Sequence, residues 1–93
     1  MKESYVYILT NSYITTFYIG VTSDLTKRVT EHKNGIGSTF TKKYNLKDLI
    51  YFEEFTDINQ AISREKQLKN WRKDWKLNLI KKENPELKTL NIM

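Results

Sequence analysis

Two residues that can bind anions or move protons lie beside the apolar side of a predicted helix. Over residues 24–34, Leu25 and Val29 define the apolar stripe of that helix. Arg28 and His32 fall at the border of this stripe and are neighbours on one helix surface, because they lie four residues apart. This placement indicates either a functional site or, for His32, an imidazole that is satisfied within the fold or faces solvent.

A carboxylate lies on the apolar side of a second predicted helix. Within residues 58–69, Glu65 falls between Ala61 and Ile62 in helical phase. Burying a carboxylate without a partner is costly, so Glu65 needs a cation, a metal ion or a hydrogen-bond donor. The sequence leaves two interpretations open: a structural ion pair between Glu65 and Arg28, or a site at which these two residues converge with other polar side chains.

Two segments rich in aromatic and β-branched residues predict a β-hairpin before these helices. Residues 4–10 and 15–22 form its strands, and polar residues lie between them. A turn centred on residues 12–13 would place Tyr7 directly opposite Tyr18. These tyrosines are then either ordinary strand aromatics or part of the same site.

The remaining elements are predicted from caps, stop signals and one apolar run. Ser23 is a good N-cap for the helix over residues 24–34, and Gly35 is a good C-terminal stop. We expect one domain over residues 1–83 and a tail at 84–93. The other elements are a third strand at 46–55, the helix at 58–69 after the cap Asp57, and a last helix at about 71–82 before Asn84 and Pro85.

The composition excludes several classes of site. Sixteen Lys and Arg against eleven Asp and Glu give a formal charge of +5, and the chain has no Cys and one His. Without Cys there are no disulfides, iron–sulfur clusters or thiol nucleophiles, and a reducing compartment is favoured. A divalent cation would be held mainly by carboxylate oxygen, which suits Mg²⁺ or Mn²⁺ better than Zn²⁺.

The distribution of charge suggests a polyanionic partner and no membrane segment. The first apolar run, Tyr5–Leu9, is too short for a signal peptide or a membrane span, which predicts a cytoplasmic protein. Most of the excess positive charge lies between Arg64 and Lys82, interleaved with Trp71 and Trp75. This pattern is typical of a surface that follows a phosphate backbone, and equally of a solvated helix face above two core tryptophans.

Several short motifs along nearly the whole chain resemble those of the GIY-YIG nuclease superfamily. Tyr5-Val6-Tyr7, followed after ten residues by Tyr18-Ile19-Gly20, is similar to its two-part signature, with Tyr5 in place of the usual first glycine. The chain is most similar to small stand-alone bacterial members. The resemblance continues through Arg28, Glu31-His32-Lys33, Thr41-Lys42-Lys43-Tyr44, Arg64-Glu65-Lys66 and Leu79-Ile80 to Asn84-Pro85.

This resemblance implies an α/β (α+β) fold, a small three-stranded antiparallel sheet flanked by helices, and a metal-dependent endonuclease that cuts one strand at a time. It also implies one Mg²⁺ or Mn²⁺ ion with Glu65 as protein ligand. The implied catalytic residues are Tyr7, Tyr18, Arg28, His32 and Glu65, with Asn78 as a spacing candidate for holding the phosphate. Basic candidates for nucleic-acid binding are Lys42, Lys43, Lys69, Arg72, Lys73 and Lys76.

These side chains suggest a division of roles in phosphodiester hydrolysis. As a hypothesis, the ion on Glu65 polarises the phosphate, and Arg28 neutralises the charge that develops on it. Tyr7 acts as general base on water, His32 accepts or orients its proton, and Tyr18 positions the phosphate or the water. A tyrosine pKa near ~10 makes a poor base at neutral pH, so Tyr7 depends on nearby positive charge.

Three functions follow as hypotheses. The first is an endonuclease that nicks DNA in repair or recombination and takes its selectivity from the shape of the nucleic acid or from a protein partner. The alternative is a non-catalytic nucleic-acid-binding module with the same fold. The third is a protein-interaction domain in which Arg28 and Glu65 form a structural ion pair.

Overall fold

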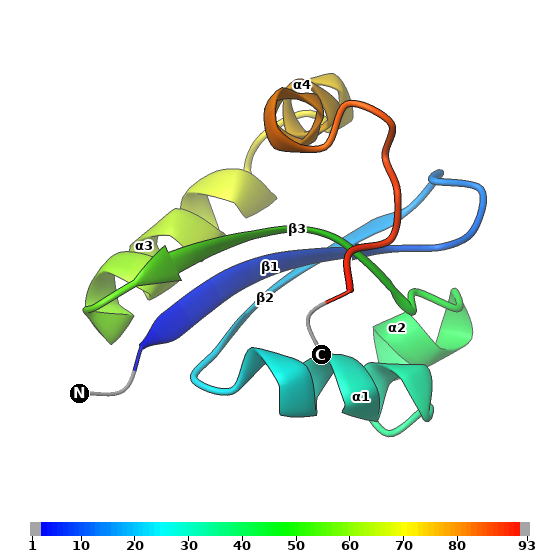
Figure 1. Cartoon of the computed structure of the whole chain (residues 1–93), viewed down its shortest axis with the longest axis horizontal. Helices are drawn as coiled ribbons and strands as arrows, with labels where there is room; N and C mark the ends of the chain where they lie inside the picture. Colours follow the sequence, from blue (N-terminus) through cyan, green and yellow to red (C-terminus); the bar gives the residue numbers. More distant parts are fainter. Residues whose placement is uncertain (1–2, 92–93) are drawn as a thin grey trace.

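A computed structural model describes residues 3–91, which form one antiparallel sheet and four helices (Figure 1). The strands are β1 (Ser4–Thr10), β2 (Phe17–Thr22) and β3 (Asp48–Phe55), in the order β2-β1-β3. The helices are α1 (Leu25–Lys33), α2 (Thr39–Lys43), α3 (Ile58–Lys69) and α4 (Lys73–Glu83). The predicted α+β class with a three-stranded antiparallel sheet is therefore confirmed.

The connection between β1 and β2 is longer than predicted. Tyr7 pairs with Gly20, so the predicted pairing of Tyr7 with Tyr18 is wrong. The side-chain oxygen of Asn11 accepts hydrogen bonds from the backbone N–H groups of residues 15 and 16, which keeps these residues in the turn. Because the pairing shifts by an even number of residues, Tyr7 and Tyr18 still share one face of the sheet.

Each face of the sheet is covered by its own pair of helices, with α1 and α2 on one side and α3 and α4 on the other (Figure 1). Strand side chains alternate between faces, so β1 contributes to both cores. The core on the α1 side contains Tyr7, Leu9, Leu25, Val29, Leu46 and Leu49. The core on the α3–α4 side contains Val6, Ile8, Ile19, Ile50, Tyr51, Ala61, Leu68 and Ile80.

Both ends of α1 are fixed by hydrogen bonds. Asp24, rather than the predicted Ser23, is the N-cap, and its side chain accepts a bond of 3.1 Å from the backbone N–H of Lys27. At the other end Gly35 has a φ of +74°, a left-handed value that suits glycine. Its N–H donates to the carbonyl of His32 at 3.1 Å, which holds the last turn of the helix in place.

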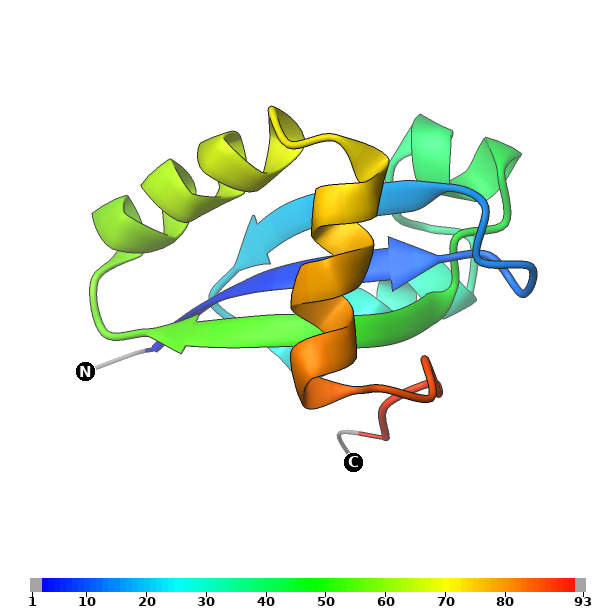
Figure 2. The same cartoon turned by 90° about the horizontal axis from the view of Figure 1, so that it is seen from above.

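The other helices agree with the sequence to different degrees. α3 has the predicted bounds and the predicted N-cap, Asp57. α4 begins at Lys73, somewhat later than expected, and crosses over the sheet from the β2 side toward β3 (Figure 2). α2 was not predicted, because its five residues are too few to show a helical period; the Ser38 side chain caps it by accepting from the Thr41 N–H at 3.1 Å.

The segment after α4 returns along the outer edge of β3. The backbone N–H of Leu90 donates to the carbonyl of Leu49 at 2.7 Å, and the buried Asn84 side chain donates to the carbonyl of Ile50 at 3.0 Å. Residues 92 and 93 of the predicted tail, and residues 1 and 2, lie outside the described residues. Within residues 3–91, no helix combines the length and apolar character needed to cross a membrane.

Candidate active site

The hydroxyl group of Tyr7 and the imidazole of His32 meet on the α1 side of the sheet. Tyr7 Oη lies 3.2 Å from His32 Nε2, and both residues are buried. Gly20, opposite Tyr7 on β2, makes the contact possible, because a Cβ atom at this position would overlap the Tyr7 hydroxyl and ring. The glycine of the second tyrosine motif therefore has a steric role in the site.

The second ring nitrogen of His32 is also hydrogen-bonded. Its Nδ1 lies 3.0 Å from Thr41 Oγ1, and Thr41 Oγ1 donates its own proton to the carbonyl of Ser38 at 2.9 Å. Thr41 Oγ1 also accepts from the Ser38 hydroxyl at 3.2 Å. We assign the tautomer in which Thr41 accepts the Nδ1–H of His32, because Nε2 then carries no proton and can accept from Tyr7. The result is a directed chain from the Tyr7 hydroxyl through His32 to Thr41.

The segment before α2 is shaped around the His32 ring. A Cβ atom at Gly37 would overlap the ring at Nδ1 and Cε1, so only glycine at this position leaves enough room for the imidazole. The sequence did not reveal the roles of Gly37 and Thr41. Thr41 was marked only as part of the resemblance, in the run Thr41-Lys42-Lys43-Tyr44, and nothing local marked Gly37.

Tyr18 completes an aromatic group with Tyr7 and His32. Its ring centroid lies 6.2 Å from that of Tyr7 and 5.6 Å from that of His32. On its other side, the Tyr18 ring lies 6.3 Å from the ring of Phe40 on α2. The two predicted tyrosines are thus neighbours on one face, although they do not pair directly across the strands.

Arg28 and Glu65 come from helices on opposite faces of the sheet. The Arg28 side chain is 47% exposed on α1 and lies 3.7 Å from Glu31. The Glu65 side chain on α3 is 17% exposed and lies 3.5 Å from Lys69. Among the described residues, Arg28 and Glu65 do not form the ion pair that was one of the sequence interpretations, because each is paired along its own helix.

Electrostatics nevertheless link these two residues to the tyrosine. Burial raises the pKa of Tyr7 well above its ordinary value; the charge of Arg28 lowers it and that of Glu65 raises it. Burial also lowers the pKa of His32, and the charge of Arg28 adds to this effect. At neutral pH the pair therefore consists of a neutral phenol and a neutral imidazole.

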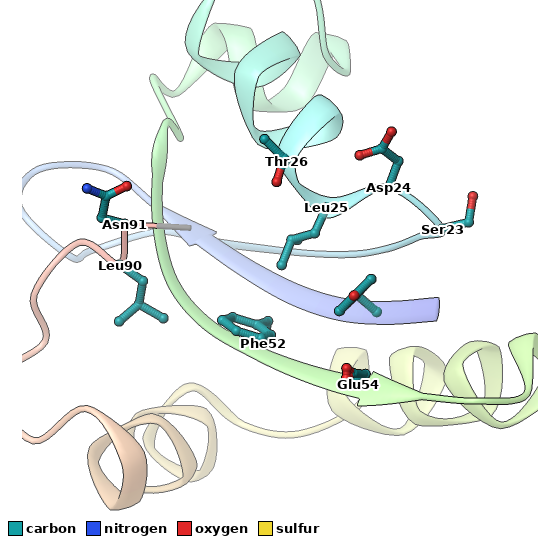
Figure 3. Close-up of a pocket in the computed structure, with 9 residues that line it drawn as sticks. Ser23, Asp24, Leu25, Thr26, Phe52, Glu54, Leu90 and Asn91 are labelled. Atoms are coloured by element: carbon teal, nitrogen blue, oxygen red, sulfur yellow. The ribbon is translucent and has the colours of Figure 1, made fainter. Parts of the chain in front are cut away.

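Two surface hollows lie beside the start of α1. One, of about 860 Å³, runs from Arg28 past the end of β2 to the start of α3 at Ile58. The other, of about 570 Å³, lies on the β3 side and contains the carboxylates Asp24 and Glu54 (Figure 3). The hollow beside Arg28 also contains one carboxylate, Asp57, whereas the other has two carboxylates and no basic side chain. The hollow beside Arg28 is therefore the better place for a nucleic-acid backbone.

Glu65 remains the candidate metal ligand. Across residues 3–91, no three His, Cys, Asp or Glu side chains come together as a ready-made ligand set. Mg²⁺ usually keeps several waters and takes one or two carboxylates together with substrate phosphates. A single, mostly buried carboxylate fits that ion, or Mn²⁺, better than a four-ligand Zn²⁺ site.

The predicted nucleic-acid-binding residues fall in two places. Lys42 and Lys43 lie on α2, on the same side of the sheet as His32. The others surround the junction of α3 and α4, where contacts within the chain engage several of them. Lys73 Nζ donates to the carbonyl of Thr15 at 2.7 Å, Arg72 lies 3.0 Å from Asp74, Lys69 pairs with Glu65, and Lys76 is half-buried.

Asn78 lies apart from the tyrosine–histidine group. It is exposed on α4 and lines a hollow of about 200 Å³ with Trp71 and Trp75. Trp71 is half-buried and Trp75 is exposed, so the two tryptophans are not both core residues.

Comparisons with known proteins agree with this architecture. The family model of the GIY-YIG catalytic domain matches residues 3–78. The chain is 38% identical to a UPF0213 protein of Clostridium perfringens, over 96% of this chain and 99% of that protein. It is 38% identical to a UPF0213 protein of Syntrophus aciditrophicus, over 92% and 98%. A solution NMR structure of a UPF0213 protein from Bacillus halodurans has the same fold, with a TM-score of 0.60 and 24% identity, over 94% of this chain and 92% of that one.

Proposed function

The chain belongs to the GIY-YIG catalytic domain family, and from this membership we propose that it is a metal-dependent endonuclease that nicks DNA by hydrolysing a phosphodiester bond. The observation that best supports the proposal is the hydrogen-bond chain from Tyr7 through His32 to Thr41. It offers a proton acceptor beside an exposed arginine. A buried phenol needs a hydrogen-bond acceptor in any fold, but an imidazole is an acceptor that can also take up the proton near neutral pH.

The first role of these residues is to receive the proton of the attacking water. Because burial raises the pKa of Tyr7, its hydroxyl cannot act as a base alone. Instead, water gives a proton to Tyr7 Oη while the phenol passes its own proton to His32 Nε2. Tyr7 ends neutral and His32 ends as imidazolium. The lowered pKa of His32 keeps it unprotonated, and so available, at neutral pH.

The second role is to handle the charge of the phosphate. Arg28 has an exposed guanidinium that can donate to phosphate oxygens at the edge of the adjoining hollow. Tyr18, beside Tyr7, orients the phosphate or the water. Glu65 would hold a Mg²⁺ or Mn²⁺ ion, which when bound supplies Lewis-acid charge to the phosphate and the leaving oxygen. We place this activity in DNA repair or recombination in the cytoplasm, with selectivity from DNA shape or a protein partner.

The direct test is nicking of a supercoiled plasmid in the presence of Mg²⁺ or Mn²⁺. The wild-type protein should convert it to the relaxed form, and Glu65→Gln should lose this activity while its circular dichroism stays unchanged. Glu86→Gln is a matched control, because Glu86 is an exposed carboxylate that also pairs with a nearby lysine, Lys88, at 2.7 Å. Full activity in Glu65→Gln would contradict the metal assignment. Salt-sensitive DNA binding without any nicking would favour the non-catalytic module.

A further inference from the structure

We propose that the aromatic rings of Phe40, on α2, and Tyr44, the residue that caps α2, stack on the bases of an unpaired DNA strand next to the site of cutting. The inference rests on the proposed function, since it names the form of DNA that reaches Tyr7 and His32. Its first support is a pair of exposed aromatic rings. Phe40 is 44% exposed and Tyr44 is 42% exposed, and their ring centroids lie 4.8 Å apart. Such rings offer flat apolar surface that nothing else among residues 3–91 covers completely.

The two rings are continuous with the candidate active site. Phe40 lies 6.3 Å from Tyr18, with an angle of 31° between the ring planes, and Tyr18 lies 6.2 Å from Tyr7. An uninterrupted row of aromatic side chains thus leads from the surface of α2 to the hydroxyl that faces His32. A strand with a base on Phe40 would have its neighbouring phosphates close to Tyr18.

The charge around these rings suits a nucleic acid. Residues 33–47 contain four lysines and no Asp or Glu. One of the lysines, Lys43, places its Nζ 5.3 Å from the centroid of the Tyr44 ring. A positive surface with aromatic rings is the combination that binds single strands, because lysines follow the backbone while the rings stack on bases.

The stacking requires an unpaired strand. In a duplex the base faces contact each other and are closed to side chains, whereas unpaired bases can stack on aromatic rings. Phe52 provides a contrast within the same molecule. It is 38% exposed, yet it lies on β3 beside the carboxylate Glu54 in the hollow of Figure 3, where a DNA strand would be repelled.

The experiment is a binding measurement under conditions that prevent cutting. Fluorescence anisotropy with EDTA present would compare a short single-stranded oligonucleotide with a blunt duplex of the same sequence. We expect the wild-type chain to prefer the single strand, and Phe40→Ala and Tyr44→Ala each to weaken single-strand binding by about tenfold or more, with little change for the duplex. Phe40→Trp, which keeps an aromatic face, should retain the binding. Phe52→Ala is the matched control and should bind like the wild type.

Two results would overturn the inference: equal weakening of single-strand and duplex binding by Phe40→Ala, or a loss in Phe52→Ala as large as that in Phe40→Ala. Because EDTA prevents cutting, failure of the proposed nuclease activity is recorded separately. Ring-dependent binding by a protein that never nicks DNA would contradict the nuclease proposal and still support the stacking surface. Nicking without ring-dependent binding would support the nuclease proposal and contradict the stacking surface.

Discussion

The Tyr7 hydroxyl lies 3.2 Å from Nε2 of His32, and this contact links the central strand of the sheet to the last turn of α1. Two glycines far apart in the sequence make room for it. Gly20 leaves space for the phenol, and Gly37 leaves space for the imidazole. The backbone at each glycine therefore packs directly against one of the two rings and helps to fix its position.

Thr41→Val should disturb the proton chain without changing the volume of the side chain. Valine cannot accept the Nδ1–H of His32, so the imidazole loses the bond that fixes its tautomer. We expect nicking to fall by about tenfold or more. Long-range ¹H–¹⁵N correlation should find the proton of neutral His32 on Nδ1 in the wild type. In the variant it should find a mixture of the Nδ1–H and Nε2–H tautomers. Thr39→Val, an exposed position on the same helix, is the control. An unchanged His32 spectrum in Thr41→Val would refute the assigned tautomer.

Gly37→Ala should destabilise the protein through the His32 ring. The added methyl group overlaps the imidazole, so the free energy of unfolding should fall by about 1–3 kcal/mol. Urea unfolding measures this loss. Gly35→Ala tests the same loop for backbone strain alone, because the φ of Gly35 is +74° and no heavy atom lies within 4 Å of its added Cβ. Only Gly37→Ala should shift the His32 resonances; if both variants shift them equally, the steric role of Gly37 is wrong.

The stability of the fold should depend on pH through His32. Burial and Arg28 lower its pKa below the ordinary value of about 6.5, so near and below that pH the unfolded chain binds a proton that the folded chain resists. Stability is therefore fully present above about pH 6.5 and decreases as the pH falls toward the pKa of folded His32. Thermal unfolding between about pH 7.5 and 5.5 should follow this trend, and His32→Gln should reduce its slope. An equal slope in both proteins would show that other groups cause the dependence.

The Arg64–Glu53 pair should be a strong contact between α3 and β3. Arg64 donates to both carboxylate oxygens of Glu53, at 2.9 and 3.0 Å, and both side chains are largely shielded from water. A double-mutant cycle with Arg64→Ala and Glu53→Ala, read by urea unfolding, should give a coupling free energy of about 1–2 kcal/mol. The exposed Arg72–Asp74 pair should show little coupling. If the two pairs couple equally, the Arg64–Glu53 contact does not hold α3 in place. The residue after Arg64 is Glu65, so loss of the contact should also reduce nicking.

Local sequence patterns predicted most of the helices and strands. The geometry of the candidate active site depends instead on contacts between residues that are distant in the sequence. Asp57 and an apolar stripe were sufficient to place α3, and helical phase identified His32 and Glu65 as unusual for a plain core. The supposed pairing of Arg28 with Glu65 failed because phase cannot tell which face of a sheet a helix covers. The hairpin register failed because a loop organised by Asn11 does not resemble a tight turn in sequence.

The roles of the residues that complete the site could not be predicted from the sequence for a similar reason. Thr41 and Gly37 matter only because α2 folds back toward α1, and five residues are too few to reveal that helix by periodicity. The two tyrosines were correctly predicted to be neighbours, although the predicted register was wrong, because the pairing is shifted by an even number of residues. Side-chain alternation kept Tyr7 and Tyr18 on one face.

The return of the C-terminal segment along β3 bears on solubility. β3 is an outer strand, and an uncovered outer strand can pair with the same strand of another molecule and begin aggregation. Leu90 and Asn84 occupy the carbonyls of Leu49 and Ile50 on that edge. Truncation before residue 84 would remove this cover, so we expect the shortened protein to associate at concentrations at which the full chain does not.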